Sequence, residues 1–167
     1  MTDAATRDAT TLVHRVYIRA TPQAVWDAIT QPEWNRRYGY PGWSEYQLRP
    51  GGAFRGMAGP EMQAMGAPDV IVDGEVVEVD PPHRLVQTGR FCWGDAVRAE
   101  GFQRVTWETA EELGGVTRLT VTHELAGAPL SAAQVGSSAP LEQGGGGWSF
   151  ILSDLKTLLE TGAGVQG

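Results

Sequence analysis

Six short runs of strand-forming residues fill the chain between residues 43 and 124, and they constrain the fold more than any other feature. They read WSEYQL, AFRGM, DVIVDGEVVEV, RLVQTGRF, FQRVTWET and VTRLTVTHEL. The breaks between them are RPGG, DPPH, a stretch around Gly94, and EELGG, which supply the residues that tight turns need. Runs at this hairpin spacing predict a meandering antiparallel sheet.

The segment before this sheet predicts one further strand and two short helices. TLVHRVYIRA (residues 11–20) is rich in β-branched and aromatic residues and predicts the first strand. In TPQAVWDAIT, Thr21 is placed to cap a helix and Pro22 to occupy its first position. PEWNRRYG predicts a second helix that begins at Pro32 and ends at Gly39.

The last part of the chain predicts a long amphipathic helix. Its apolar residues recur at helical spacing: Trp148, Ile151, Leu152, Leu155, Leu158 and Leu159. We expect Ser149, Asp154, Lys156 and Glu160 to take the solvent side and Gly162 to end the helix.

Strand alternation sorts the sheet residues into two faces. One face is expected to carry Leu85, Gln87, Gly89, Phe91, Val105, Trp107, Leu119, Val121 and His123. The opposite face carries the polar residues Arg104, Thr106, Arg118 and Thr120. The sheet should therefore have one solvated face and one face that the terminal helix covers.

Four consecutive glycines, Gly144 to Gly147, raise the question of a phosphate-binding loop. Such a loop follows a strand and opens a helix with a lysine and a hydroxyl residue, whereas here Trp148 follows and no lysine is near. We interpret the run as a helix entry whose missing side chains let the backbone lie close to the sheet or leave open volume. Because glycine in a helix costs about 1 kcal/mol relative to alanine, we expect a mobile gate.

Charge argues against two classes of partner. The formal net charge is -7, and Arg36 and Arg37 form the only adjacent basic pair. A polyanion would therefore meet net repulsion, and neither nucleic acid nor an anionic membrane surface is an expected partner.

Length and local composition predict a single domain in the cytoplasm. A chain of 167 residues can bury a real core, and we expect one domain over residues 11–162 between flexible tails at 1–10 and 163–167. The first residues lack the basic and apolar regions of a signal peptide, no apolar run reaches the ~20 residues of a membrane span, and Cys92 has no second cysteine to pair with. We therefore expect no membrane insertion.

His123 is the one titratable side chain that we retain as a catalytic candidate, although no catalytic residue is assigned. On the covered face it could orient a ligand carbonyl or act as a general acid or base near neutral pH, while a hydrogen-bonded core histidine is the commoner case. The sequence contains no HExxH, CxxC or GxSxG motif. No metal site and no cofactor are expected.

Aromatic and methionine side chains suggest a binding cavity, with filling of the core as the alternative. The segment GMAGPEMQAMGAPD contains three methionines among glycines and prolines, so it is interpreted as a flexible lid or, alternatively, as a surface loop. The candidate ligand-binding residues are Trp34, Trp43, Phe54, Met57, Met62, Met65, Val72, Gln87, Phe91, Trp107, His123, Trp148 and Leu152.

Several strings, in this order, resemble the START-like or SRPBCC superfamily. They are ATPQAVWDAITQPEW, LRPGGAFRG, DGEVVEVDPPHRLVQT, GVTRLTVTHE and GWSFILSDLKTLLE, and together they span nearly everything from Val13 to Thr161. Within that superfamily they are similar to the homologues of the activator of heat-shock protein 90 ATPase. The resemblance implies an α+β helix-grip fold, in which a curved antiparallel sheet wraps around a long C-terminal helix and two short helices follow the first strand.

The same resemblance implies a deep, largely apolar cavity between sheet and helix. Members bind lipids, sterols, polyketides or other hydrophobic molecules, and some act as cyclases or dehydratases. Relatives often carry bulkier or polar residues, frequently a histidine, where this chain has Gly144 to Gly147, so a wider cavity is expected.

Three functions follow as hypotheses. The first is binding of a hydrophobic or aromatic small molecule, which is then the expected partner. The second is a cyclase, aromatase or dehydratase that uses the same cavity. The third is an interaction module for a chaperone or regulator, although the eukaryotic namesake has a further N-terminal domain. A homodimer is also left open.

Overall fold

Seven strands form the sheet of the computed structural model, which describes residues 11–165. They are β1 (Thr11–Ile18), β2 (Gly42–Tyr46), β3 (Ala53–Ala58), β4 (Val70–Asp80), β5 (Arg84–Phe91), β6 (Gln103–Glu111) and β7 (Thr117–Glu124). All neighbours pair antiparallel, in the order β1-β7-β6-β5-β4-β3-β2. The predicted tail at 1–10 and the last two residues of the tail at 163–167 lie outside the described residues.

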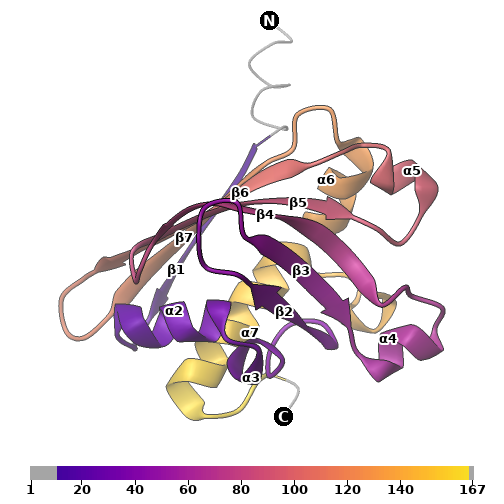
Figure 1. The fold of residues 1–167 in the computed structure, drawn as a ribbon. Helices are drawn as coiled ribbons and strands as arrows, with labels where there is room; N and C mark the ends of the chain where they lie inside the picture. The colour runs from indigo at the N-terminus through magenta and orange to yellow at the C-terminus, as the bar shows by residue number, and fades with distance from the viewer. Residues whose placement is uncertain (1–10, 166–167) are drawn as a thin grey trace, which may run out of the picture.

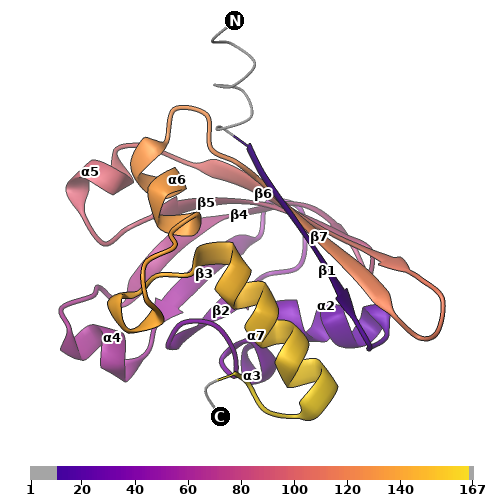
Figure 2. The same cartoon turned by 180° about the vertical axis from the view of Figure 1, so that it is seen from behind.

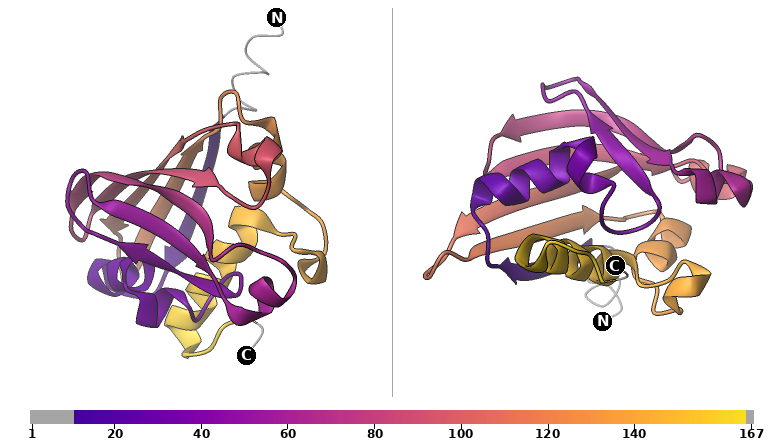
Figure 3. Two further views of the ribbon diagram at one scale, coloured as in Figure 1. Left: turned by 45° about the vertical axis from the view of Figure 1, so that its right-hand side comes forward. Right: turned by 90° about the horizontal axis from the view of Figure 1, so that it is seen from below.

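The helices lie mainly on one side of this sheet. They are α2 (Pro22–Thr30), α3 (Pro32–Asn35), α4 (Pro60–Ala64), α5 (Asp95–Arg98), α6 (Pro129–Val135), the 3-10 turn η1 (Leu141–Gln143) and α7 (Gly147–Thr161). Figures 1 and 2 show α7 crossing the sheet diagonally, and Figure 3 shows α2 and α7 on the side toward which the sheet curves. The predicted helix-grip architecture is confirmed.

The ends of the two main helices follow from single residues. The hydroxyl of Thr21 accepts a hydrogen bond from the backbone nitrogen of Ala24 at 3.1 Å, and Pro22 opens α2. Gly162 ends α7 in a left-handed conformation, with φ of 86°, as the sequence predicts. No helix within residues 11–165 is long and apolar enough to cross a membrane.

The short helices differ from the prediction. α3 ends at Asn35, not near Gly39, because the Asn35 side chain turns inward and donates to the carbonyl oxygens of Ile29 and Ser44. The predicted methionine lid contains the helix α4, whose Gly59-Pro60 start is a recognisable N-terminal signal. Two further helices, α5 and α6, were not predicted.

The two faces of the sheet agree with strand alternation, with one exception. Leu85, Leu119 and Val121 are fully buried on the covered face, where they pack with α2 and α7. Thr106 was expected in solvent but is 7% exposed. It lies in the middle of the sheet between its cross-strand partners Val86 and Thr122, which shield it.

Asp154 also contradicts the expected solvent side of α7. Its side chain is 4% exposed, and its carboxylate accepts hydrogen bonds from the backbone nitrogens of Gly39, at 2.7 Å, and Val165, at 2.6 Å. A buried carboxylate is tolerated when backbone donors satisfy it. Asp154 therefore joins the loop after α3 and the end of the described chain to the terminal helix.

Candidate functional site

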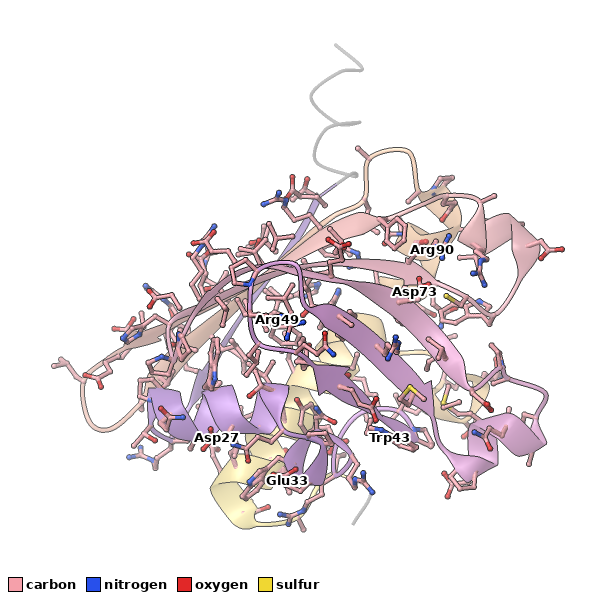
Figure 4. All side chains as sticks on the ribbon, viewed as in Figure 1. Asp27, Glu33, Trp43, Arg49, Asp73 and Arg90 are labelled. Atoms are coloured by element: carbon pink, nitrogen blue, oxygen red, sulfur yellow. The ribbon has the colours of Figure 1, made fainter. Side chains whose placement is uncertain are left out.

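A cavity of about 350 Å³ lies between the curved face of the sheet and α7. Ten of the candidate ligand-binding residues line it: Trp43, Phe54, Met57, Met62, Val72, Gln87, Phe91, Trp107, His123 and Trp148. Trp43 comes from the edge strand β2, which lies at the front of the molecule in Figure 4. The predicted residues from the sheet, the α4 segment and α7 thus lie together in the structure.

Three candidates lie elsewhere. Trp34 packs partly buried against the main core, with the Arg37 guanidinium 4.8 Å from its ring centroid. Met65 follows the end of α4, and its side chain is 87% exposed. Leu152 is 4% exposed and faces the core between α7 and the sheet. The structure does not bring these residues to the cavity wall.

Several wall residues were missed by the sequence reasoning. They are mainly polar or aromatic: Tyr38, Tyr40, Ser44, Tyr46, Trp93, Gln103, Gln134 and Ile151. Gln103 could have been found, since it alternates with Val105 and Trp107 along β6. Gln134 could not, because the helix that carries it was not recognised.

Two glycines make room for Val72 in the cavity wall. A Cβ atom at Gly56 on β3 would lie 3.2 Å from the Val72 side chain, and a Cβ atom at Gly89 on β5 would also lie 3.2 Å from it. Val72 therefore fills the space that two cross-strand glycines leave, and all three residues line the cavity. Gly89 was placed on the covered face by alternation, and its position agrees.

Gln87 is the centre of one hydrogen-bonded group in the wall. Its oxygen Oε1 accepts from the Tyr46 hydroxyl at 2.9 Å and from the Trp107 indole nitrogen at 3.0 Å. Burial raises the pKa of Tyr46, so this hydroxyl is protonated and donates. The group ties β2, β5 and β6 together at the cavity.

A second group runs from α7 through the sheet to α6 and to Glu100, which follows α5. The Trp148 indole donates to Nδ1 of His123 at 3.0 Å, and Nε2 of His123 lies 2.8 Å from Oε1 of Gln103. Gln103 donates to the Ser131 hydroxyl at 2.9 Å, which donates to the Glu100 carboxylate at 2.6 Å. An indole nitrogen only donates, so His123 must carry its proton on Nε2.

His123 is therefore a neutral, doubly hydrogen-bonded histidine. Burial lowers its pKa to about 4, because the charged form would lose its hydration. Protonation of Nδ1 would also break the bond from Trp148. Both ring nitrogens are engaged by protein partners, which favours a positioning role and argues against proton transfer near neutral pH.

The glycine run packs closely against neighbouring backbone, and each of its four positions requires glycine for a physical reason. Gly144, Gly146 and Gly147 have positive φ values of 77°, 97° and 53°. A Cβ atom at Gly145 or Gly147 would lie 1.9 Å from the carbonyl oxygen of Ala139 or Val135, respectively. The close approach that we expected is thus made to the segment around α6, not to the sheet. The expected mobility stays a prediction.

Tyr40 holds the glycine run through two hydrogen bonds. Its hydroxyl donates to the carbonyl oxygen of Gly145 at 2.7 Å and accepts from the backbone nitrogen of Gly147 at 2.8 Å. Tyr40 and Phe150 also meet edge to face, with ring centroids 5.4 Å apart. The entrance to α7 therefore forms part of the cavity wall as a hydrogen-bonded turn.

One charged cluster lies on β4 and β5 near α5, where Figure 4 labels Asp73 and Arg90. The Arg90 guanidinium, 2.8 Å from the Asp73 carboxylate, lowers the pKa of that carboxyl. Burial raises the pKa of the neighbouring Cys92 thiol, which opposes the thiolate that a nucleophile needs. Within residues 11–165 no group of three or more histidine, cysteine or acidic side chains is placed to hold a metal ion.

A curved sheet that encloses a cavity against its terminal helix defines a helix-grip domain. Residues 19–160 match the family described as Activator of Hsp90 ATPase homolog 1-like protein, and the chain belongs to that family. No curated protein matches the chain.

Solved structures support the same fold. DynU16, described as a protein in the dynemicin biosynthetic locus, is 25% identical with a TM-score of 0.64, over 93% of this chain and 49% of its own. The Q3J4M4_RHOS4 protein from Rhodobacter sphaeroides is also 25% identical, with a TM-score of 0.66, over 91% and 93%. PFC0360w, an HSP90 activator from Plasmodium falciparum, is 20% identical with a TM-score of 0.55, over 94% and 91%. The chain thus spans about half the length of DynU16.

Proposed function

We propose that this protein binds a hydrophobic or aromatic small molecule in the cavity between the sheet and α7. The observation that carries the proposal is the cavity of about 350 Å³, lined mainly by aromatic, methionine and aliphatic side chains. Pockets of this size and lining are typical of sites for apolar ligands. A lipid-like or polyketide-like molecule is the class that the family resemblance suggests.

The polar groups in the wall support an apolar occupant. His123 and Gln103 are bonded to each other, Trp107 is bonded to Gln87, and Tyr40 is bonded to the glycine run. Groups that are already paired do not demand a polar ligand, and a neutral His123 adds no charge. The cavity therefore offers mainly apolar contact.

The enzymatic alternative loses its catalytic candidate. A cyclase that used His123 as acid or base would need a pKa near neutral pH, and the pKa of His123 is lowered to about 4. The family description and the description of the P. falciparum protein both name activation of Hsp90. Interaction with a chaperone is therefore the remaining alternative for this chain.

Native mass spectrometry and a neutral fluorescent probe test the proposal together. Freshly purified protein is compared with its denatured mass to detect a bound molecule, and N-phenyl-1-naphthylamine is then titrated into the unloaded protein. Saturable binding with one site, accompanied by quenching of tryptophan fluorescence, is expected, because Trp107 and Trp148 line the cavity.

A pair of valine variants on β4 locates the binding. Val72→Trp places an indole in the cavity and is expected to weaken binding of N-phenyl-1-naphthylamine at least tenfold. Val77→Trp is the matched control, because Val77 is 39% exposed on the same strand and should leave binding unchanged. Equal binding by both folded variants, or no saturable binding by the wild type, would contradict the proposal.

A further inference from the structure

The side-chain amide of Gln87 has a fixed orientation. The Trp107 indole nitrogen lies 3.0 Å from one atom of this amide, and an indole nitrogen can only donate. That atom must therefore be the oxygen Oε1, and the second donor to it is the Tyr46 hydroxyl. Rotating the amide by 180° would place two N–H donors against the indole N–H.

Both hydrogen bonds therefore engage the amide oxygen of Gln87 and neither engages its nitrogen. Within residues 11–165, Nε2 of Gln87 has no hydrogen-bond partner, although the residue is only 3% exposed. In the same residues, His14 Nε2 alone is both fully buried and without a partner, so Nε2 of Gln87 keeps accessible surface. Because Gln87 is buried and lines the cavity, the cavity is the space to which this nitrogen has access.

This situation sets Gln87 apart from His123 and from the indoles of Trp107 and Trp148. His123 uses both ring nitrogens and the indoles of Trp107 and Trp148 donate within the protein. A donor in apolar surroundings gains most from a partner that reaches it, because leaving it unpaired costs more than a typical hydrogen bond contributes. No arginine or lysine lines the cavity within the described chain, so a carboxylate would remain uncompensated.

We propose that Gln87 determines specificity by donating from Nε2 to a neutral acceptor oxygen, such as a ketone or other carbonyl, on an otherwise apolar aromatic ligand. The proposal rests on the proposed function and names its ligand class. Tyr46 and Trp107 hold the amide oxygen and so aim the nitrogen. Such a preorganised donor discriminates between ligands of equal shape that do and do not carry the acceptor.

Two probes of nearly the same shape test this directly. 2-Acetylnaphthalene carries a carbonyl where 2-isopropenylnaphthalene carries a methylene group, and each is measured by displacement of N-phenyl-1-naphthylamine. We expect the wild type to bind the ketone about tenfold more tightly than the alkene, which corresponds to about 1.4 kcal/mol. Each binding free energy is corrected with the partition coefficient of its compound. The difference in hydration between the ketone and the alkene then does not contribute to the comparison.

Variants assign the preference to the amide nitrogen. Gln87→Glu keeps an oxygen that accepts from Tyr46 and Trp107 and replaces the amide nitrogen by a second oxygen, so as a carboxylate it has no donor and the preference for the ketone should be lost. Tyr46→Phe removes the adjacent hydroxyl and leaves Trp107 to hold the amide, so the preference for the ketone should persist. A preference that survives Gln87→Glu at pH 8 would overturn the proposal.

Infrared spectroscopy supplies a measurement that needs no variant. The stretching band of ¹³C-labelled 2-acetylnaphthalene should move to lower frequency in the wild-type protein than in hexane, as a hydrogen-bonded carbonyl does. Saturable binding of both probes with equal affinity and an unshifted band would overturn the role of Gln87 alone. Binding of neither probe would overturn the proposed function, and the inference with it.

Discussion

The indole nitrogen of Trp148 lies 3.0 Å from Nδ1 of His123, and this bond joins the first turn of α7 to strand β7. The two rings also meet edge to face, with centroids 5.9 Å apart. Because the indole can only donate, the bond requires a neutral His123. Stability and protonation are therefore coupled at this contact.

The first prediction concerns pH. Burial lowers the pKa of His123 from 6.5 to about 4, so the unfolded chain binds more protons between these values. Stability is then fully present above about pH 6.5 and is lost as the pH falls through the window. Linkage gives a loss of about 2 kcal/mol in the free energy of unfolding between about pH 7 and pH 5.

Urea unfolding at several pH values measures this loss, with His123→Gln as the control. The variant keeps a polar, neutral side chain, so subtracting its pH profile removes the contributions of His14 and the carboxylates. Identical profiles for wild type and variant, or an NMR titration of His123 near pH 6.5, would show that the histidine is not held neutral.

A double-mutant cycle should detect the bond itself. Trp148→Phe and His123→Leu are expected to couple by about 1 kcal/mol in the free energy of unfolding, since each single change removes the same hydrogen bond. Trp43→Phe paired with His123→Leu is the control, because the Trp43 indole donates to Glu45 instead. Additivity in the first cycle would contradict the contact.

The glycine run should respond unequally to alanine. Gly144→Ala meets no atom within 4 Å and costs only the strain of its positive φ, about 1–2 kcal/mol. Gly147→Ala adds a Cβ atom 1.9 Å from the carbonyl oxygen of Val135 and should cost clearly more, about 4 kcal/mol or loss of folding. Gly94→Ala, with open space and an extended backbone, should be nearly neutral. Thermal unfolding of the three variants checks this order.

Asp154 provides the fourth prediction. Asp154→Ala leaves the backbone nitrogens of Gly39 and Val165 without their acceptor and should lower the free energy of unfolding by about 2–3 kcal/mol. Asp154→Asn keeps one acceptor oxygen and should cost about half as much. Ser153→Ala, at an exposed position of the same helix, should stay within about 0.5 kcal/mol. Equal stability of the two Asp154 variants would contradict the contribution of the acceptor oxygen that asparagine retains.

The sheet and terminal helix were predictable because their signals are periodic. Alternation along β6 and β7 placed Trp107 and His123 on the covered face, and helical spacing placed Leu155 in the core. The family resemblance then predicted where the cavity lies. Gly59-Pro60 is a usable signal for the start of α4. The other glycine and proline residues of this segment nevertheless favoured the prediction of a loop.

The features that could not be predicted from the sequence depend on contacts between residues that are distant in the chain. Asp154 has the pattern of a solvent-facing residue, and only the backbone of Gly39, far away in the chain, explains its burial. The free nitrogen of Gln87 likewise follows from where Trp107 and Tyr46 place their donors. Alternation could put Gln87 on the right face, but it could not show which end of the amide is already used.

The glycine run limits how this protein can change its ligand. Each of its glycines is required by a left-handed backbone or by a carbonyl oxygen at close range, so adding side chains there would damage the fold before it altered the cavity. Wall residues on β3, β4 and α4, such as Met57, Val72 and Met62, carry no such restriction of the backbone. Divergence toward new ligands, in nature or in directed evolution, should therefore accumulate on the side of the sheet and α4, while the entrance to α7 stays unchanged.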